Sequence, residues 1–397
     1  MGNCLERLFS TDMINEKKKI SHSIQSLNGI RVIMILIVFV SHMEFLTNYS
    51  YGLFYSKYLH NAVLGVDYFF MLSGFGMMYS KLVNNVKIEP DIKNCIEYAI
   101  RKVKKIYPLY IGLIVICIPS FIINCIEYGR SYFYIIITGV IKFIFCILMI
   151  QSLFGNQSLS HAFNGVNWFL SSLFLISIIA PIYIKIINRI KRISRLFLML
   201  VCAVFITIIV YIIFGYLDGN FFFNTLQYES PIIRSFYVVI GMICAKINLS
   251  FQGRLTNRYK TKVFFSGVEI ILLLMSLMWF LCRNSIRKSF LACIVIDLLL
   301  CASIIIFYSF EMGAISKLLS RKIFRKTSGL VMYFFLVHYP VRIYVDLLFQ
   351  NITQYGKEPW IGVIEVFLVF LISFFATISI SLFCKHNNIK DFLHKRQ

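Results

Sequence analysis

Charged residues are scarce in this sequence of 397 residues, because Asp, Glu, Lys and Arg together make up only 15% of it. A soluble domain carries about a quarter of its residues as these four types. Hydrophobic residues account for 59% of the chain, and the mean hydropathy is +0.76. This composition excludes an ordinary soluble globular domain and indicates a protein that lies largely in lipid.

Paired cysteines are also missing. The 11 cysteines are scattered, mostly within apolar segments, and no Cys-x-x-Cys pair occurs. This pattern favours small buried hydrophobic side chains over disulfides or metal ligands. We therefore expect no metal and no tightly bound cofactor. No small-residue cleavage site follows a short apolar core near the N-terminus, so we also expect no removable signal peptide.

Long apolar runs are abundant instead. The sequence contains eleven apolar windows of about 20 residues, each long enough to cross a bilayer as a helix. They lie near 30–47, 62–80, 106–124, 133–151, 167–187, 196–216, 231–248, 263–282, 289–309, 328–349 and 361–384. We therefore predict an all-α fold, a polytopic membrane helical bundle with no soluble domain.

The basic residues orient these runs, because cytoplasmic loops retain Lys and Arg. Basic clusters precede the first run and follow the second, fifth, seventh, ninth and last. Alternating crossings reproduce this pattern except around 106–124 and 133–151. We therefore predict ten crossings, both termini in the cytoplasm, and a re-entrant or interfacial piece near 125–151.

This topology divides the chain into three parts. We expect a cytoplasmic N-terminal segment (1–28), a membrane domain (29–384) and a cytoplasmic basic tail (385–397). The net charge of +22 is then largely the cytoplasmic side of the protein, facing anionic lipids. The charge therefore does not require a nucleic-acid partner.

The first apolar run carries ionisable side chains, which are costly in a low-dielectric interior. Arg31 and His42 are eleven residues apart, close to three helical turns, so they share one helix face about 16 Å apart. Glu44 points elsewhere, and we expect it to be a polar residue at the outer edge.

Other runs place ionisable groups at a similar depth. Asp67 lies about five residues into the second run, and His338 lies near the middle of the tenth. Arg342 and Asp346 follow His338 at spacings of four, so the three form a polar stripe on one helix face.

Each of these residues also has a simpler structural explanation. Arg31 fits a positive-inside anchor, His42 a hydrogen bond between helices, and Asp67 a helix cap or a partner of Arg342. Arg342 and Asp346 fit an ion pair within one helix. The convergence of two His, an Asp and an Arg on separate helices favours a site, because such groups normally face a bundle interior or an aqueous cavity.

Six stretches resemble, in the right order, motifs of the membrane acyltransferase-3 family. They are GIRVIMILIVFVSH (Arg/Lys-x10-His), GVDYFFMLSGF, RKVKKIYPLY, NGVNWFLSSLF, SPIIRSFYVVIGM and SGLVMYFFLVHYP, spread over residues 29–340. Two features depart from the family pattern. Leu173 stands where many relatives have Glu, and the stripe of Arg342 and Asp346 lies outside the matched motifs.

The resemblance implies a bacterial inner-membrane enzyme of about ten helices. Such enzymes move an acyl group, usually acetyl, from cytoplasmic acyl-CoA to a hydroxyl of an envelope carbohydrate or another acceptor. The matched residues suggest a catalytic group. We expect His42 to transfer protons near neutral pH and His338 to be a second proton-transfer group or a substrate hydrogen bonder. Asp67 is expected either to orient His42 or to neutralise Arg234 or Arg342.

Donor and acceptor are assigned to opposite ends of the site. Arg31, Arg101, Lys102, Lys105 and Tyr107 are expected to bind CoA at the cytoplasmic face, since its phosphates need cations. The pantetheine arm then runs along the first helix toward the histidine.

The expected acceptor-binding residues are Trp168, Arg234, Ser73 and Arg342, and the acceptor enters over the loop 152–166. Ser73 fits packing between helices better than a nucleophile. Direct transfer and an acyl-enzyme relay both remain open.

A transporter or flippase, which carries a glycolipid or acyl group without chemistry, is the alternative. Its usual signature is an inverted repeat or paired broken helices in matching halves, and the sequence contains no convincing example. A glycosyl polymerase or ligase usually carries a large external loop, whereas the external loops here are short.

Overall fold

The computed structural model describes residues 24–86, 89–217, 225–252, 255, 259–286, 290–352 and 358–394. Within these residues the chain is entirely helical, with no strand. Most of the predicted N-terminal segment (residues 1–23 of 1–28) lies outside the described residues, as do residues 395–397 of the predicted basic tail 385–397.

The described residues of the first half of the chain form nine α-helices, a 3-10 helix (η1) and a π-helix (η2). They are α2 (Gln25–Ser41), η1 (Glu44–Asn48), α3 (Gly52–Phe54), η2 (Tyr55–Leu59), α4 (Val63–Val83), α5 (Ile92–Val103), α6 (Tyr107–Ile116), α7 (Ile118–Glu127), α8 (Tyr132–Ile147), α9 (Gln157–Ser160) and α10 (Asn167–Asn188). The second half supplies α11 (Ile193–Leu217), α12 (Thr225–Glu229), α13 (Pro231–Phe251), α14 (Tyr259–Cys282), η3 (Arg283–Ile286), α15 (Phe290–Ser309), α16 (Ala314–Leu319), α17 (Lys322–Ser328), α18 (Val331–Ile352) and α19 (Pro359–His394).

All eleven predicted apolar runs are helical. Within the described residues, nine helical stretches are long and apolar enough to cross a membrane, and the apolar helices α2 and α8 are shorter. The prediction of an all-α, polytopic membrane bundle is therefore confirmed. Of the two runs that broke the parity, α6 and α7 together form a long stretch, whereas α8 has 16 residues. That length is about 24 Å, less than the roughly 30 Å of a hydrocarbon core.

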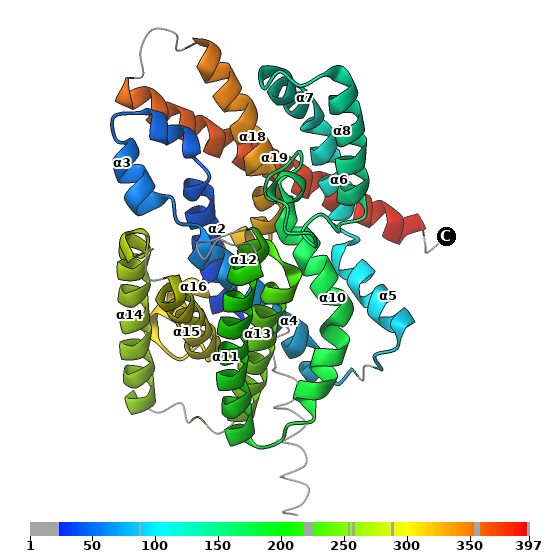
Figure 1. Ribbon diagram of the computed structural model, residues 1–397. Helices are drawn as coiled ribbons and strands as arrows, with labels where there is room; N and C mark the ends of the chain where they lie inside the picture. Colours follow the sequence, from blue (N-terminus) through cyan, green and yellow to red (C-terminus); the bar gives the residue numbers. More distant parts are fainter. Residues whose placement is uncertain are drawn as a thin grey trace, which may run out of the picture.

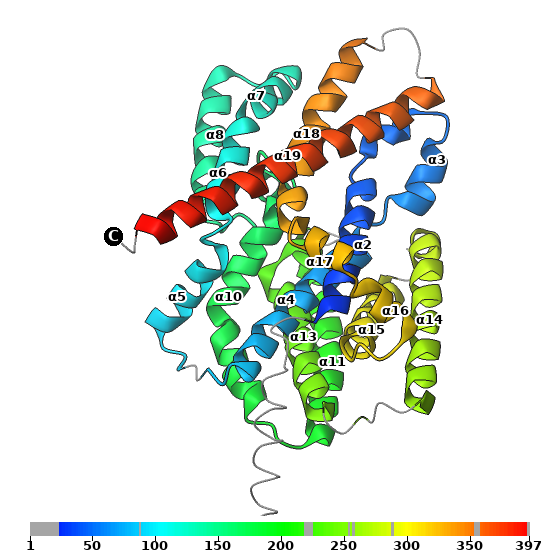
Figure 2. The same ribbon diagram turned by 180° about the vertical axis from the view of Figure 1, so that it is seen from behind.

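The helices form two groups that meet around α2 (Figure 1). In that view α10, α13 and α11 pack together in the lower half, α15 and α16 separate them from α14 at the left edge, and α6, α7 and α8 form a group above them. The long helix α19 packs against α18 and crosses the back of the molecule (Figure 2). Because α2 packs against α4, α15, α16, α17 and α18, its C-terminal end lies in the interior, between the two groups.

Helices α4 and α13 cross with their backbones in contact. A Cβ atom on Gly74 would lie 1.9 Å from the carbonyl oxygen of Val238, and one on Gly241 would lie 1.8 Å from that of Met71. Small residues allow such close approach between membrane helices. The crossing fixes how the two helices are rotated about their axes, and therefore which polar side chains meet between them.

Candidate active site

A pair of stacked histidines lies at the centre of the site. His42 follows the last residue of α2, and His338 lies in the middle of α18. Their ring centroids are 5.2 Å apart with an interplanar angle of 18°, and Nδ1 of His42 lies 2.9 Å from Nε2 of His338. The structure thus brings together two of the three residues predicted to be catalytic.

The hydrogen bonds of this pair assign its tautomers. Nδ1 of His338 lies 3.1 Å from the carbonyl oxygen of Phe334, which can only accept, so this nitrogen carries a proton. In a neutral His338 ring, Nε2 is then the acceptor, and Nδ1 of His42 donates to it. Nε2 of His42 therefore keeps its lone pair and makes no hydrogen bond with any residue that the structure describes.

The histidine pair adjoins a cavity of about 610 Å³, which we call the histidine cavity. Its wall combines aromatic rings with groups that donate or accept hydrogen bonds. These lining side chains include His42, Glu44, His60, His161, Trp168, Tyr228, Glu229, Arg283 and Tyr339. A concave site in which a few polar groups converge is the usual form of a small-molecule site.

Two ion pairs flank the histidine cavity. Nε2 of His161 lies 2.6 Å from Oε1 of Glu229, and Nη2 of Arg342 lies 3.2 Å from Oε2 of Glu44. Glu44, expected to be a polar residue of the outer edge that points away from His42, is exposed but lines the same cavity as His42. Burial opposes the charged form of His161, yet the hydrogen bond and charge of Glu229 raise the pKa of His161 above its ordinary value.

Asp67 forms a buried ion pair with Arg234. Nη1 of Arg234 lies 2.5 Å from Oδ1 of Asp67, and both side chains are fully buried. Of the three partners considered for Asp67, the structure selects Arg234, and Asp67 makes no hydrogen bond with His42. The crossing of α4 and α13 explains this choice, because the two residues lie on those helices about one turn from the contact.

The guanidinium of Arg234 is enclosed by aromatic rings. Its Cζ lies 4.5 Å from the ring centroid of Tyr228, 5.9 Å from that of Trp168, and also near Phe70 and Tyr237. Cation–π contacts of this kind stabilise a desolvated cation. Since Tyr228 and Trp168 also line the histidine cavity, the ion pair lies directly behind the cavity wall.

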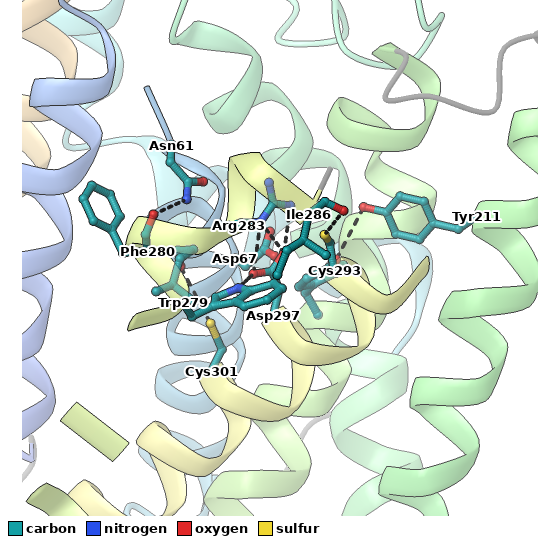
Figure 3. Close-up of polar contacts among 12 residues, drawn as sticks. Asn61, Asp67, Tyr211, Trp279, Phe280, Arg283, Ile286, Cys293, Asp297 and Cys301 are labelled. Carbon is teal, nitrogen blue, oxygen red and sulfur yellow. Dashed lines mark hydrogen bonds and ion pairs between the residues drawn. The ribbon is translucent and has the colours of Figure 1, made fainter. Parts of the chain in front are cut away.

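Sequence reasoning missed a second charged pair in the wall (Figure 3). Nε and Nη2 of Arg283 lie 2.9 and 2.8 Å from Oδ2 of Asp297, and the indole N–H of Trp279 donates to Oδ1 of Asp297 at 2.6 Å. Arg283 lines the cavity. Asp297 interrupts the apolar run 289–309. Because a carboxylate is costly within a membrane segment, its presence there could have indicated a buried partner.

Several predicted binding residues lie away from the histidine cavity. Ser73 donates to the backbone of its own helix at Phe69, and Tyr107 donates to the carbonyl oxygen of Ile147. Arg101 forms an exposed ion pair with Glu97. These side chains are not among those that line the cavity.

Lys102 and Lys105, two further predicted cations, also lie outside the cavity lining. The half-buried Arg31 on α2 does not line the cavity either. Lys105 is exposed, and Lys102 lies over the ring of Tyr98. Burial, together with the charge of Lys81, lowers the pKa of Lys102. Arg31 makes no ion pair with any residue that the structure describes.

A family model described as an acyltransferase domain matches residues 24–385. No curated protein and no solved structure matches the chain. The matched range includes every residue of the histidine cavity and both histidines of the pair.

Proposed function

The chain belongs to the membrane acyltransferase-3 family, and from this premise we propose that it moves an acyl group, most simply acetyl, from acyl-CoA to an acceptor hydroxyl. The family makes it a membrane acyltransferase; the donor, the acceptor and the acetyl group are our proposal. The observation that carries it is the hydrogen-bonded pair of His42 and His338 beside a polar cavity.

His42 is the proposed general base. Its unprotonated Nε2 takes the proton of the acceptor hydroxyl while the hydroxyl oxygen bonds to the thioester carbonyl carbon. The bond between that carbon and sulfur then breaks, and the CoA thiolate receives the proton from His42. His338 is a positioning residue here, because it accepts from Nδ1 of His42 and so fixes the tautomer and the ring orientation.

Arg31 is the proposed anchor of the donor. A position eleven residues before His42 on the same helix face corresponds to about 16 Å, a suitable length for the pantetheine arm. An unpaired, half-buried guanidinium suits a phosphate. The proposal keeps Arg101, Lys102, Lys105 and Tyr107 as cytoplasmic contacts of the nucleotide end.

The acceptor is proposed to be a carbohydrate or another hydroxyl compound of the cell envelope. Trp168 in the cavity wall offers an aromatic face, and Glu44, Glu229 and His161 offer hydrogen bonds. We place the protein in the bacterial inner membrane with both termini in the cytoplasm, so that acyl-CoA reaches Arg31 and the acceptor reaches the cavity from outside.

Release of free thiol from acetyl-CoA by the purified protein in detergent tests the proposal. With glycerol added as a small acceptor, we expect wild type and a Ser276→Ala control to release thiol, because Ser276 only hydrogen-bonds the backbone of its own helix. We expect His42→Ala to abolish release, and Arg31→Ala to raise the KM for acetyl-CoA. A wild-type protein that neither binds nor consumes acetyl-CoA would instead favour a transporter or flippase.

A further inference from the structure

Three polar residues of α18 line a second cavity. This cavity of about 570 Å³ lies between α7, α8 and α18, and we call it the second cavity. Arg342, Asp346 and Gln350, spaced four residues apart, all face it. These three residues lie outside the family motifs, and the proposed reaction uses neither Asp346 nor Gln350.

Two more polar stripes converge on the same space. Ser120 and Asn124 face it from α7, and Thr138 and Lys142 face it from α8. The opposite faces of these two helices carry exposed apolar side chains. Three helices that each turn polar residues toward one cavity, at a cost to their stability in lipid, indicate a binding site rather than chance.

The second cavity adjoins the histidine cavity. His161 and Tyr339 line both. The ring of Tyr339 stands edge-on to that of His42 at 5.7 Å, and Arg342 of the second cavity pairs with Glu44 of the histidine cavity. The two cavities are therefore neighbours, with Tyr339 and the ion pair of Arg342 and Glu44 at their boundary, close to His42.

The charges of the second cavity balance, which identifies the ligand class. Two cations, Arg130 and Lys142, are equal in number to two carboxylates, Glu127 and Asp346. Arg342 and His161 are already paired, with Glu44 and Glu229. A CoA nucleotide would require a surplus of cations. A lipid tail would leave these polar groups desolvated without partners. An uncharged ligand rich in hydroxyls satisfies donors and acceptors alike.

Aromatic rings complete this wall. Phe121, Tyr134 and Phe163 line the cavity, and Lys142 and Arg130 lie over the rings of Phe121 and Tyr134 at 5.2 Å each. A sugar ring has an apolar C–H face that packs on aromatic rings and a rim of hydroxyls that donate and accept.

We propose that the second cavity binds the units of an uncharged oligosaccharide acceptor that lie beyond the unit acylated at His42. The proposal rests on the acyltransferase function above and names its acceptor class. It also gives Asp346 and Gln350 a role as acceptor contacts remote from the reacting atoms.

The test is to fill the second cavity. Thr138→Trp places a large ring in it, and the matched control Val140→Trp places the same ring on the exposed face of α8. Each variant replaces the chromosomal copy, and the acetate that mild base releases from the cell envelope is measured. The same proteins are purified, and thiol release from acetyl-CoA is measured with glycerol as a small acceptor.

We expect Thr138→Trp to lower envelope acetate about tenfold or more while changing the glycerol reaction less than about twofold. Val140→Trp should resemble wild type in both. Unchanged envelope acetate in Thr138→Trp, or equal loss in both assays, would overturn the proposal. Lys142→Met, a milder change, should show the same split if Thr138→Trp does not fold. Wild-type protein that neither releases thiol from acetyl-CoA nor contributes acetate to the envelope would instead refute the proposed donor and acceptor.

Discussion

Nδ1 of His42 donates to Nε2 of His338, whose own Nδ1 donates to the carbonyl oxygen of Phe334. This chain of hydrogen bonds joins the end of α2 to the middle of α18 and leaves one ring nitrogen of His42 as a base. The arrangement separates two roles, because only His42 lines the cavity while His338 lies behind it, fully buried.

His338→Ala should lower kcat about 10- to 100-fold, the usual cost of losing a group that orients a functional histidine. The KM for acetyl-CoA should hardly change, because His338 does not line the cavity. His338→Gln should recover part of the loss, since an amide oxygen can accept from Nδ1 of His42. Measurement of kcat against pH checks this. If His338 had a purely structural role, the activity that survives in His338→Ala would keep the pH dependence of wild type.

The positions of the helices were predictable, but the meeting of their side chains was only partly so. Bilayer thickness dictates the length of apolar runs, so all eleven became helices. The depth of a residue also follows from its place in a run, and His42 and His338, expected at similar depth, do meet. Their chemical roles stay predictions.

The rotation of each helix about its axis was not predictable from one sequence. Asp67 meets Arg234 rather than His42, because glycines on both α4 and α13 set how those helices cross. Glu44 lies beyond Ser41, where α2 ends, so helical spacing does not give the direction of its side chain. Arg283 was missed because it follows an apolar run, where a cation resembles an ordinary loop residue.

The ion pair of His161 and Glu229 should make stability depend on pH. The pKa of His161 is raised in the folded state, so the pair contributes fully below the unfolded value of about 6.5 and loses its contribution as pH rises through the folded value. As pH rises from about 6.5 through the folded pKa of His161, the Tm of wild type in detergent should therefore fall. The Tm of Glu229→Gln should fall by less over the same pH range. Equal pH dependence of the two Tm values would contradict the assignment.

Two glycines on the same helix should respond in opposite ways to alanine. In Gly74→Ala the new Cβ would lie 1.9 Å from a carbonyl oxygen of α13, whereas at Gly76 no atom lies within 4 Å. We expect Gly74→Ala to lose folded protein in detergent. Gly76→Ala should keep or raise the Tm, since alanine favours a helix by up to about 1 kcal/mol over glycine. The yield of monodisperse protein and the Tm measure this contrast, and similar behaviour of the two variants would refute the close crossing.

Replacing one member of the ion pair of Asp67 and Arg234 should destabilise the protein more than replacing both. Asp67→Asn leaves the guanidinium buried without its counter-charge, which typically costs about 3–5 kcal/mol. Replacing both residues, as in Asp67→Asn with Arg234→Met, removes the unpaired charge, so the double variant should be more stable than Asp67→Asn alone. Unfolding in detergent of wild type, Asp67→Asn, Arg234→Met and the double variant provides the comparison. If the two changes are simply additive, the residues do not act as a pair. If the double variant regains stability but not thiol release, the pair also shapes the cavity wall through Trp168 and Tyr228, which pack on Arg234.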